Sequence, residues 1–269
     1  MKLEGKTAIV TGGARGNGFA AAKLMAEEGA DIVIADICAD METIPYPMST
    51  PETMADAVKS IEQLGRKAIG IKCDVRKAAD VEAMVDQAME VFGKIDILVN
   101  NAGNSSMMAV ADMSEQEWDE VLDTHLKGTF LCCKYVVPKM IDAHYGKIVS
   151  ISSVGGHRGF GMGAHYCAAK HGIIGLTKAL SMETADHNIN VNVVCPGTVW
   201  TPMMQGVANF FGMEEEEAKE AFLAGHSFKD REIMPEDIGR AVLWLATEDT
   251  RCITGQSILV DAGWTARAP

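Results

Sequence analysis

Tyr166 and Lys170 lie four positions apart and could together exchange a proton with a substrate. On a helix, side chains four positions apart share a face, so the Lys170 ammonium would stand beside the Tyr166 phenol. A nearby positive charge lowers a phenol pKa from its reference value of about 10 towards neutrality, which would make Tyr166 a usable base. The pair alone is a weak signal, because most chance Y-x-x-x-K pairs lie on helix surfaces.

A glycine-rich segment, TGGARGNG at residues 11–18, lies between an expected strand and a helix-forming segment. Gly12, Gly16 and Gly18 would let the backbone turn tightly and approach a pyrophosphate at the positive end of that helix. The spacing G-x-x-x-G-x-G differs from the commoner dinucleotide fingerprint, and alone it could be only a flexible turn. Its position at the start of an alternating chain favours a nucleotide-binding loop.

Asp36 closes the second expected strand, about 20 residues beyond the glycines, where a carboxylate can accept hydrogen bonds from the adenosine ribose. The same charge would repel a 2′-phosphate. Arg15, inside the loop, could instead pair with that phosphate. We expect NAD rather than NADP, because Asp36 would occupy the space that the phosphate needs.

Short apolar runs rich in β-branched residues alternate with longer segments of helical pattern. This alternation predicts an α/β fold, a Rossmann-like doubly wound parallel sheet of about seven strands, because strands that are apolar on both faces need crossover helices on both sides. We expect one dinucleotide-binding catalytic domain over residues 1–269, since no linker or repeat divides the chain. The expected strands are Thr7–Thr11, Asp31–Asp36, Lys67–Lys72, Ile95–Asn100, Lys147–Ser152, Ile189–Cys195 and Ser257–Val260.

Two stretches interrupt this alternation, at residues 37–51 and at about residues 198–230. Long loops at the carboxyl ends of parallel strands border the ligand crevice of such a fold. We expect the first to lie near the adenosine and the second to form a lid over the substrate. The alternative for each is a solvated surface insertion.

Composition limits the partners and the compartment. The formal net charge of −13 argues against nucleic acid or an anionic membrane surface as the main partner. No apolar run reaches the ~18 residues of a membrane helix, and the N-terminus lacks the regions of an export signal. Seven cysteines, odd in number and without C-x-x-C spacing, predict reduced thiols in the cytoplasm, and without clustered ligands we expect no metal site.

The chain resembles the short-chain dehydrogenase/reductase family from Lys6 to about Gly263. Ser153 lies thirteen residues before Tyr166, which favours it over Ser152 as the family's serine. The segments that carry the resemblance occur in the family's order. They are TGGARGNG, Cys73-Asp74-Val75, NNAG at 100–103, ISS at 151–153, Tyr166-x-x-x-Lys170, PGTVWTPM at 196–203 and ITGQSILVDAG near the end.

This resemblance implies catalytic roles. Tyr166 would exchange a proton with the substrate oxygen while hydride passes between the substrate carbon and the nicotinamide. Lys170 would lower the Tyr166 pKa and hold the nicotinamide ribose. Ser153 would hydrogen-bond the substrate oxygen and fix its orientation.

The resemblance also implies a set of cofactor contacts. Asp74 would lie by the adenine, Asn101 and Gly103 along the cofactor, and Thr198 and Thr201 near the nicotinamide. The full set of expected contacts is Gly12, Arg15, Gly16, Asn17, Gly18, Asp36, Asp74, Val75, Asn101, Ala102, Gly103, Tyr166, Lys170, Pro196, Gly197, Thr198, Val199 and Thr201.

One residue departs from the family's pattern. His125 stands where the family usually has an Asn that helps to hold a water linking the lysine to solvent. His125 could still serve as a catalytic residue, because an imidazole can relay protons. The alternative is a tolerated substitution that slows proton exchange.

The stretch 37–51 carries a finer resemblance, to carveol-dehydrogenase-like enzymes. This group includes enzymes that hold NAD so tightly that an external redox partner recycles it. The stretch would then fold over the adenosine and slow cofactor release. Residues 52–68 would form the helix that follows.

Apolar side chains, many of them methionines, dominate the expected substrate side of the crevice. Such pockets bind bulky hydrophobic molecules, so we expect a secondary alcohol on a terpenoid-like or steroid-like ring, or the matching ketone. Alternatively, many of these residues only pack the core or a subunit interface. They are Met107, Met108, Val154, His157, Phe160, Met162, Val199, Met203, Met204, Phe210 and Phe211.

The family precedent implies a homotetramer. Two other functions stay open. The first is an NADP-linked ketone or 3-oxoacyl reductase, against which Asp36 argues. The second is a non-catalytic NAD-binding sensor, which would usually have lost the tyrosine or lysine that this chain keeps.

Overall fold

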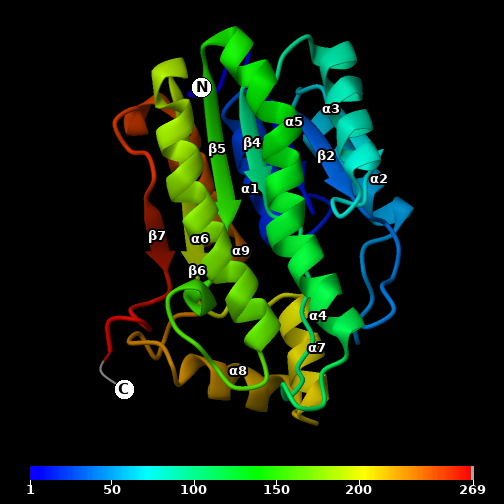
Figure 1. Cartoon of the computed structure of the whole chain (residues 1–269), viewed down its shortest axis with the longest axis vertical. Coiled ribbons are helices and arrows are strands. Elements are labelled where there is room, and N and C mark those ends of the chain that lie inside the picture. The colour runs from blue at the N-terminus through cyan, green and yellow to red at the C-terminus, as the bar shows by residue number, and fades with distance from the viewer. Residues whose placement is uncertain (268–269) are drawn as a thin grey trace.

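The computed structural model describes residues 1–267 and contains one seven-stranded parallel sheet in the order β3-β2-β1-β4-β5-β6-β7 (Figure 1). This confirms the expected Rossmann-like doubly wound fold. The direction of winding reverses between β1 and β4, and in such sheets the ligand crevice opens beyond the carboxyl ends of the strands at that point. The strands are β1 (Thr7–Thr11), β2 (Asp31–Asp36), β3 (Ala68–Lys72), β4 (Ile97–Asn100), β5 (Gly146–Ile151), β6 (Ile189–Pro196) and β7 (Ser257–Val260).

Helices cover both faces of the sheet. In Figure 1, α5 and α6 lie in front of the strands, whereas α1 and α9 lie behind them. The helices are α1 (Gly16–Glu27), α2 (Pro51–Glu62), α3 (Ala78–Phe92), α4 (Glu115–Leu122), α5 (Gly128–Ala143), α6 (Ala164–Thr184), α7 (Pro202–Phe210), α8 (Glu215–Leu223) and α9 (Pro235–Ala246). A π-helical turn at Asp123–Lys127 joins α4 to α5.

Successive side chains of a strand point to opposite faces of the sheet and pack into two separate hydrophobic cores. In β1, Val10 packs with the side chains of α1 and α9, whereas Ile9 packs with those of α3 and α5 on the other face. The helices α1 and α9 approach closely, because a Cβ at Gly239 would lie only 3.0 Å from the Ala20 carbonyl carbon. Both faces of the sheet are therefore covered by packed apolar side chains. This packing holds the strand ends in fixed positions.

The helix expected at 52–68 is shorter than predicted. It begins at Pro51, behind a capping box on Thr50, and ends at Glu62. Gly65 then adopts a positive φ of 78°, and Ala68 already pairs with Ile32 in the sheet. The pairing of β3 with β2 therefore overrides the helical pattern of the last residues.

Residues 37–50 form a segment that we call the strap. It has no helix or strand, yet Met41, Ile44 and Tyr46 are buried in a small apolar cluster that includes Met203 of α7. The strap is thus packed against the body of the protein and is not a solvated insertion.

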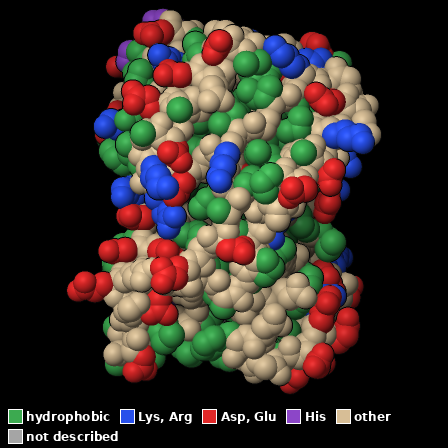
Figure 2. Space-filling model, turned by 90° about the vertical axis from the view of Figure 1, so that its right-hand side faces the viewer, with side chains coloured by type: hydrophobic (Ala, Val, Ile, Leu, Met, Phe, Trp, Pro, Cys, Tyr) green, Lys and Arg blue, Asp and Glu red, His purple; other side chains and the backbone are tan. Residues whose placement is uncertain are grey.

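The region expected as a lid carries α7 and α8 below the carboxyl ends of the strands (Figure 1). On the face drawn in Figure 2, acidic side chains gather in this lower part of the molecule. Within residues 1–267, no helix has the length and apolar character to cross a membrane. The seven cysteines are free thiols, and all except Cys252 are buried.

Candidate active site

Two cavities lie side by side along the carboxyl edge of the sheet. The first encloses about 840 Å³ near the ends of β1 and β2, and the second about 550 Å³ near the ends of β5 and β6. They form one continuous crevice, because both are lined by the same five residues. These are Asn17, Asn101, Gly103, Thr201 and Met203. A crevice of this size and length suits a dinucleotide with a second molecule at one end.

The glycine loop forms the floor of the first cavity. Gly12 has a φ of 60°, and a Cβ there would lie 2.9 Å from the Cα of Ala102. A Cβ at Gly18 would overlap the Gly12 carbonyl, so Gly18 permits the tight loop without lining the crevice. The Asn101 amide donates to the carbonyls of Thr11 and Gly12, both at 3.0 Å, and so fastens the loop to the end of β4.

Asn17 lines both cavities, and its Oδ1 is buried without a hydrogen-bond partner among residues 1–267. A buried polar atom without a partner is costly, so its presence at the crevice floor fits a site that a polar ligand completes.

Asp36 lies at the end of β2, as expected, and its carboxylate is buried in the first cavity. It accepts hydrogen bonds from the Ala14 amide at 3.2 Å, the Cys38 amide at 3.4 Å and the Ser49 hydroxyl. Arg15, the cation that could have paired with a 2′-phosphate, donates from Nη2 to the Pro47 carbonyl at 2.8 Å. The sequence-based prediction included none of these three strap partners, Cys38, Pro47 and Ser49.

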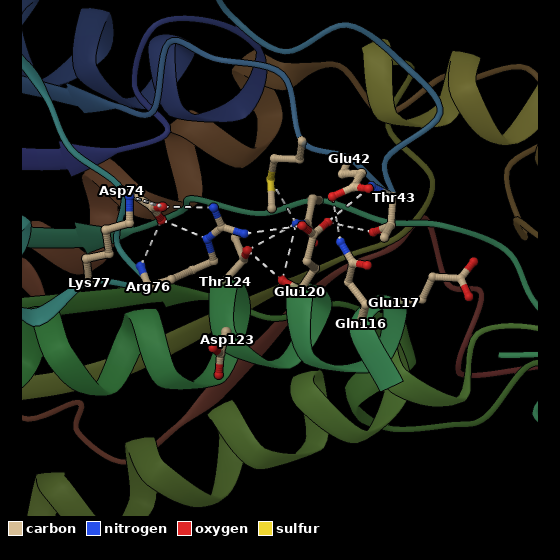
Figure 3. A network of polar contacts seen from close by, with 12 residues as sticks. Glu42, Thr43, Asp74, Arg76, Lys77, Gln116, Glu117, Glu120, Asp123 and Thr124 are labelled. Atoms are coloured by element: carbon tan, nitrogen blue, oxygen red, sulfur yellow. Dashed lines mark hydrogen bonds and ion pairs between the residues drawn. The ribbon is translucent and has the colours of Figure 1, made fainter. Parts of the chain in front are cut away.

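Asp74 and Val75 line the adenosine side of the crevice, as expected. The Asp74 carboxylate is held by Arg76 through Nε and Nη2, both at 2.8 Å (Figure 3). Partial burial acts to raise the pKa of the Asp74 carboxyl, but the hydrogen bonds from Arg76 outweigh it and hold that pKa below its usual value. Asp74 therefore remains a carboxylate beside the crevice.

The strap closes the outer side of the first cavity and is bonded to three other parts of the chain. The Tyr46 hydroxyl accepts from the Ser105 amide at 2.9 Å, and its ring packs against Gly206 of α7, where a Cβ would overlap it. Thr43 donates from Oγ1 to Glu120 of α4 at 2.6 Å, and Glu120 also pairs with Arg76 at 3.6 Å (Figure 3). The strap thus connects the adenosine side, α4 and the lid region.

Ser153, Tyr166, Lys170 and His125 meet in the second cavity. Lys170 Nζ lies 5.3 Å from the centroid of the Tyr166 ring and donates to the Ile151 carbonyl at 2.8 Å. The Ser153 hydroxyl accepts from the Gly155 amide at 3.0 Å. The helical spacing therefore brings the phenol and the amine together as predicted.

Burial has the largest effect on the pKa of both Tyr166 and Lys170. Burial raises the pKa of Tyr166 to about 12, and the neighbouring Ser153 hydroxyl acts against this rise. Burial also lowers the pKa of Lys170 to about 7. Desolvation therefore dominates the pKa of each group, and the effect of Lys170 on the Tyr166 pKa stays a prediction.

His125 lies in the π-helical turn with its ring edge towards Tyr166, 5.3 Å between centroids. Its Nε2 lies 2.6 Å from the Asn104 carbonyl, and its Nδ1 is buried without a partner among residues 1–267. Burial and the nearby Lys170 lower the pKa of His125 well below its usual value. The imidazole is thus neutral, and its buried Nδ1 lacks a partner in the wall of the second cavity.

Of the remaining predicted contacts, Gly16, Ala102, Pro196, Gly197, Val199 and Thr201 line one or both cavities. Thr198 does not. It lines a separate small cavity under α8 with Phe222 and His226, because Val199 takes the inward position and pairs with Ile233. Sequence reasoning missed the strap residues that line the first cavity, namely Ile37, Met41, Tyr46, Met48 and Ser49.

The substrate end of the crevice is apolar. Val199, Met203 and Met204 line the second cavity, and the Phe160 ring lies 6.0 Å from that of Tyr166. Phe210 and Phe211 pack edge to face at the end of α7 and are each nearly half exposed. His157, by contrast, is exposed on the surface. Within residues 1–267 no cluster of side chains is suited to hold a metal ion.

Comparisons with known proteins find relatives that match nearly the whole chain. A family model described as enoyl-(acyl carrier protein) reductase matches residues 12–265. The (−)-trans-carveol dehydrogenase of Rhodococcus erythropolis is 38% identical over 275 residues, covering 99% of each chain. A 3-oxoacyl-[acyl-carrier-protein] reductase of Chlamydia trachomatis is 39% identical, covering 97% of this chain and 98% of that one. The crystal structure of carveol dehydrogenase from Mycobacterium avium in complex with NAD matches with a TM-score of 0.94 and 35% identity, covering 99% of both chains.

Proposed function

The chain belongs to the short-chain dehydrogenase/reductase family, and we propose from this premise that it transfers hydride between a bulky, cyclic secondary alcohol and NAD. The observation that carries the proposal is the meeting of Ser153, Tyr166 and Lys170 with the apolar side chains of Val199 and Met204 in one cavity. Two relatives named carveol dehydrogenase, one of them in complex with NAD, support the cyclic alcohol and the cofactor.

The residues of the first cavity fit a dinucleotide. The glycine loop leaves room for a pyrophosphate where side chains would not fit, and the buried Oδ1 of Asn17 lacks a partner there. Asp36 would hold the adenosine ribose, and Asp74 with Val75 would flank the adenine. When bound, the nicotinamide supplies the hydride acceptor for alcohol oxidation.

The side chains of the second cavity would handle the proton and the substrate oxygen. Tyr166 takes the alcohol proton during oxidation and returns it during reduction. The Ser153 hydroxyl, next to the phenol, orients the substrate oxygen. Lys170 is fixed by the Ile151 carbonyl and would hold the nicotinamide ribose. We also propose that the free nitrogen of neutral His125 takes over the water-holding role of the family's Asn.

A substrate panel tests this proposal. Purified protein with NAD⁺ should form NADH from cyclic secondary alcohols faster than from small polyols, because Val199, Met203 and Met204 present apolar surface that a ring would cover. The rival activity is suggested by the Chlamydia trachomatis relative. Rapid reduction of 3-oxoacyl thioesters by NADPH, with no alcohol oxidised, would favour it and contradict the proposal.

Ser153→Ala should shift the pH dependence of alcohol oxidation to higher pH. Burial raises the Tyr166 pKa and the Ser153 hydroxyl opposes that rise, so loss of the hydroxyl raises the pKa further. Oxidation needs the deprotonated phenol, which is present only above its pKa. The rising limb of kcat/KM against pH should therefore move up by about one unit, since one hydrogen bond is worth about 1.4 kcal/mol.

The matched control is Ser152→Ala, because the Ser152 hydroxyl donates to the Lys170 carbonyl and not to the phenol. This variant should leave the rising limb at its original pH. A limb that stays in place in Ser153→Ala would contradict the assigned contact with Tyr166.

The strap supports a further part of the proposal, namely that NAD leaves slowly. It is packed and bonded along the outer side of the adenosine cavity, so a bound dinucleotide would be covered. If release is slower than turnover, an external redox partner must reoxidise the bound NADH. We further propose, on family precedent, that the protein works as a homotetramer, and from its free thiols that it works in the cytoplasm.

A further inference from the structure

We infer that Ser49 of the strap is a positioning residue that makes the site select NAD over NADP, acting through Asp36. The inference deepens the proposed function and rests on it, since it assumes that the crevice holds a dinucleotide. The strap would orient the Asp36 carboxylate and keep the Arg15 guanidinium away from it.

The Asp36 carboxylate is fixed on both oxygens. Oδ2 accepts from the Ala14 amide of the glycine loop at 3.2 Å, whereas Oδ1 accepts from the Ser49 hydroxyl and the Cys38 amide. Asp36 is 6% exposed and Ser49 is 5% exposed, so water competes little for these bonds. Backbone amides alone would leave Oδ1 with one long bond of 3.4 Å. Ser49 therefore sets the rotation of the carboxylate.

The donors to Asp36 are all neutral. No Lys or Arg of residues 1–267 forms an ion pair with it, so no paired cation compensates the carboxylate in the cavity. A fixed negative charge at this place repels a phosphate on the adenosine ribose and accepts hydrogen bonds from free hydroxyls.

Arg15 is the nearest candidate to reverse this preference. Its guanidinium is the kind of group that binds phosphates most strongly, and it lines the same cavity as Asp36. In the structure it donates to the Pro47 carbonyl at 2.8 Å, two residues before Ser49. Two neighbouring strap residues, Ser49 and Pro47, therefore orient the carboxylate and give the arginine a neutral partner.

The test measures binding of NADH and NADPH to the full chain by nucleotide fluorescence, without any substrate. In Ser49→Ala, the ratio of the NADPH Kd to the NADH Kd should fall about tenfold, which is the effect expected from losing one hydrogen bond to a charged group. A loosened strap alone would weaken both nucleotides alike and leave this ratio unchanged. Ser60→Ala is the matched control, because Ser60 lies on α2 and bonds only to the Asp56 carbonyl.

The double variant separates positioning from direct contact. Asp36→Ala should lower the same ratio by more than Ser49→Ala, and adding Ser49→Ala to it should change nothing further, since Ser49 acts through the carboxylate. An unchanged ratio in Ser49→Ala, or an equal tenfold fall in the Asp36→Ala background, would overturn the inference. A Ser49-dependent preference for NADH would support it even if no alcohol of the panel were oxidised, which would count only against the proposed substrate.

Discussion

Tyr166→Phe should lower kcat for alcohol oxidation by about 10²–10⁴-fold, the usual contribution of a positioned acid–base group. The change removes only the hydroxyl, and the ring can still pack against Phe160 and the edge of His125. Within residues 1–267, no other titratable side chain that lines the second cavity is placed to replace it. His125 has its pKa lowered well below the usual value, and Lys170 is turned to the Ile151 carbonyl. Steady-state NADH formation on the best alcohol of the panel measures the effect.

Tyr135→Phe is the matched control, because Tyr135 lies on α5, packs in the core beside α3 and lines neither cavity. It should retain wild-type turnover. NADH binding should be similar in both variants, since the lost hydroxyl acts on the substrate oxygen. If Tyr166→Phe keeps its turnover within a few-fold of wild type, the proton must pass through another group and the assigned mechanism is wrong.

The sheet could be predicted because its signal is local. Strands such as Ile32–Ala35 and Ile97–Val99 are apolar at every position, which is typical of strands covered on both faces, and turn residues separate them from helical segments. The positions of the glycine loop, Asp36 and the Tyr166–Lys170 pair follow from the order of these elements. Helix ends were less certain, as the early end of α2 shows, because pairing between strands competes with helical pattern.

The site departs from prediction where distant segments meet. Thr198 and Val199 are neighbours in the sequence, but only Val199 faces the crevice, since the chain has already left β6 at that point. The contact between Tyr46 and Ser105 joins residues 59 positions apart, and no local sequence pattern predicts it. Desolvation is likewise a property of the whole fold. The spacing of Tyr166 and Lys170 predicts their proximity but not the burial that moves both pKa values.

Glu120→Ala should speed the release of NADH about 10- to 100-fold, because Glu120 fastens Thr43 of the strap to α4, beside a second bond from Gln116 to Glu42. Its carboxylate accepts two hydrogen bonds from Thr43, at 2.6 Å from Oγ1 and 3.3 Å from the backbone, and pairs with Arg76 (Figure 3). Hydrogen bonds to a charged group are worth about 1.5–3 kcal/mol, and each 1.4 kcal/mol corresponds to a tenfold change. Arg76 keeps its two bonds to Asp74, so the adenosine side should retain its shape.

Displacement of bound NADH by excess NAD⁺, followed by fluorescence, measures this release. Glu115→Ala is the matched control, since Glu115 lies exposed in the first turn of the same helix and bonds to no strap residue. Glu120→Gln should fall between wild type and Glu120→Ala, because its amide oxygen can still accept from Thr43 but carries no charge for Arg76. If the wild type releases NADH rapidly, the strap does not retain the cofactor. If the wild type releases it slowly and Glu120→Ala does the same, the strap retains the cofactor through its other contacts, those of Tyr46 and Glu42, and not through this carboxylate.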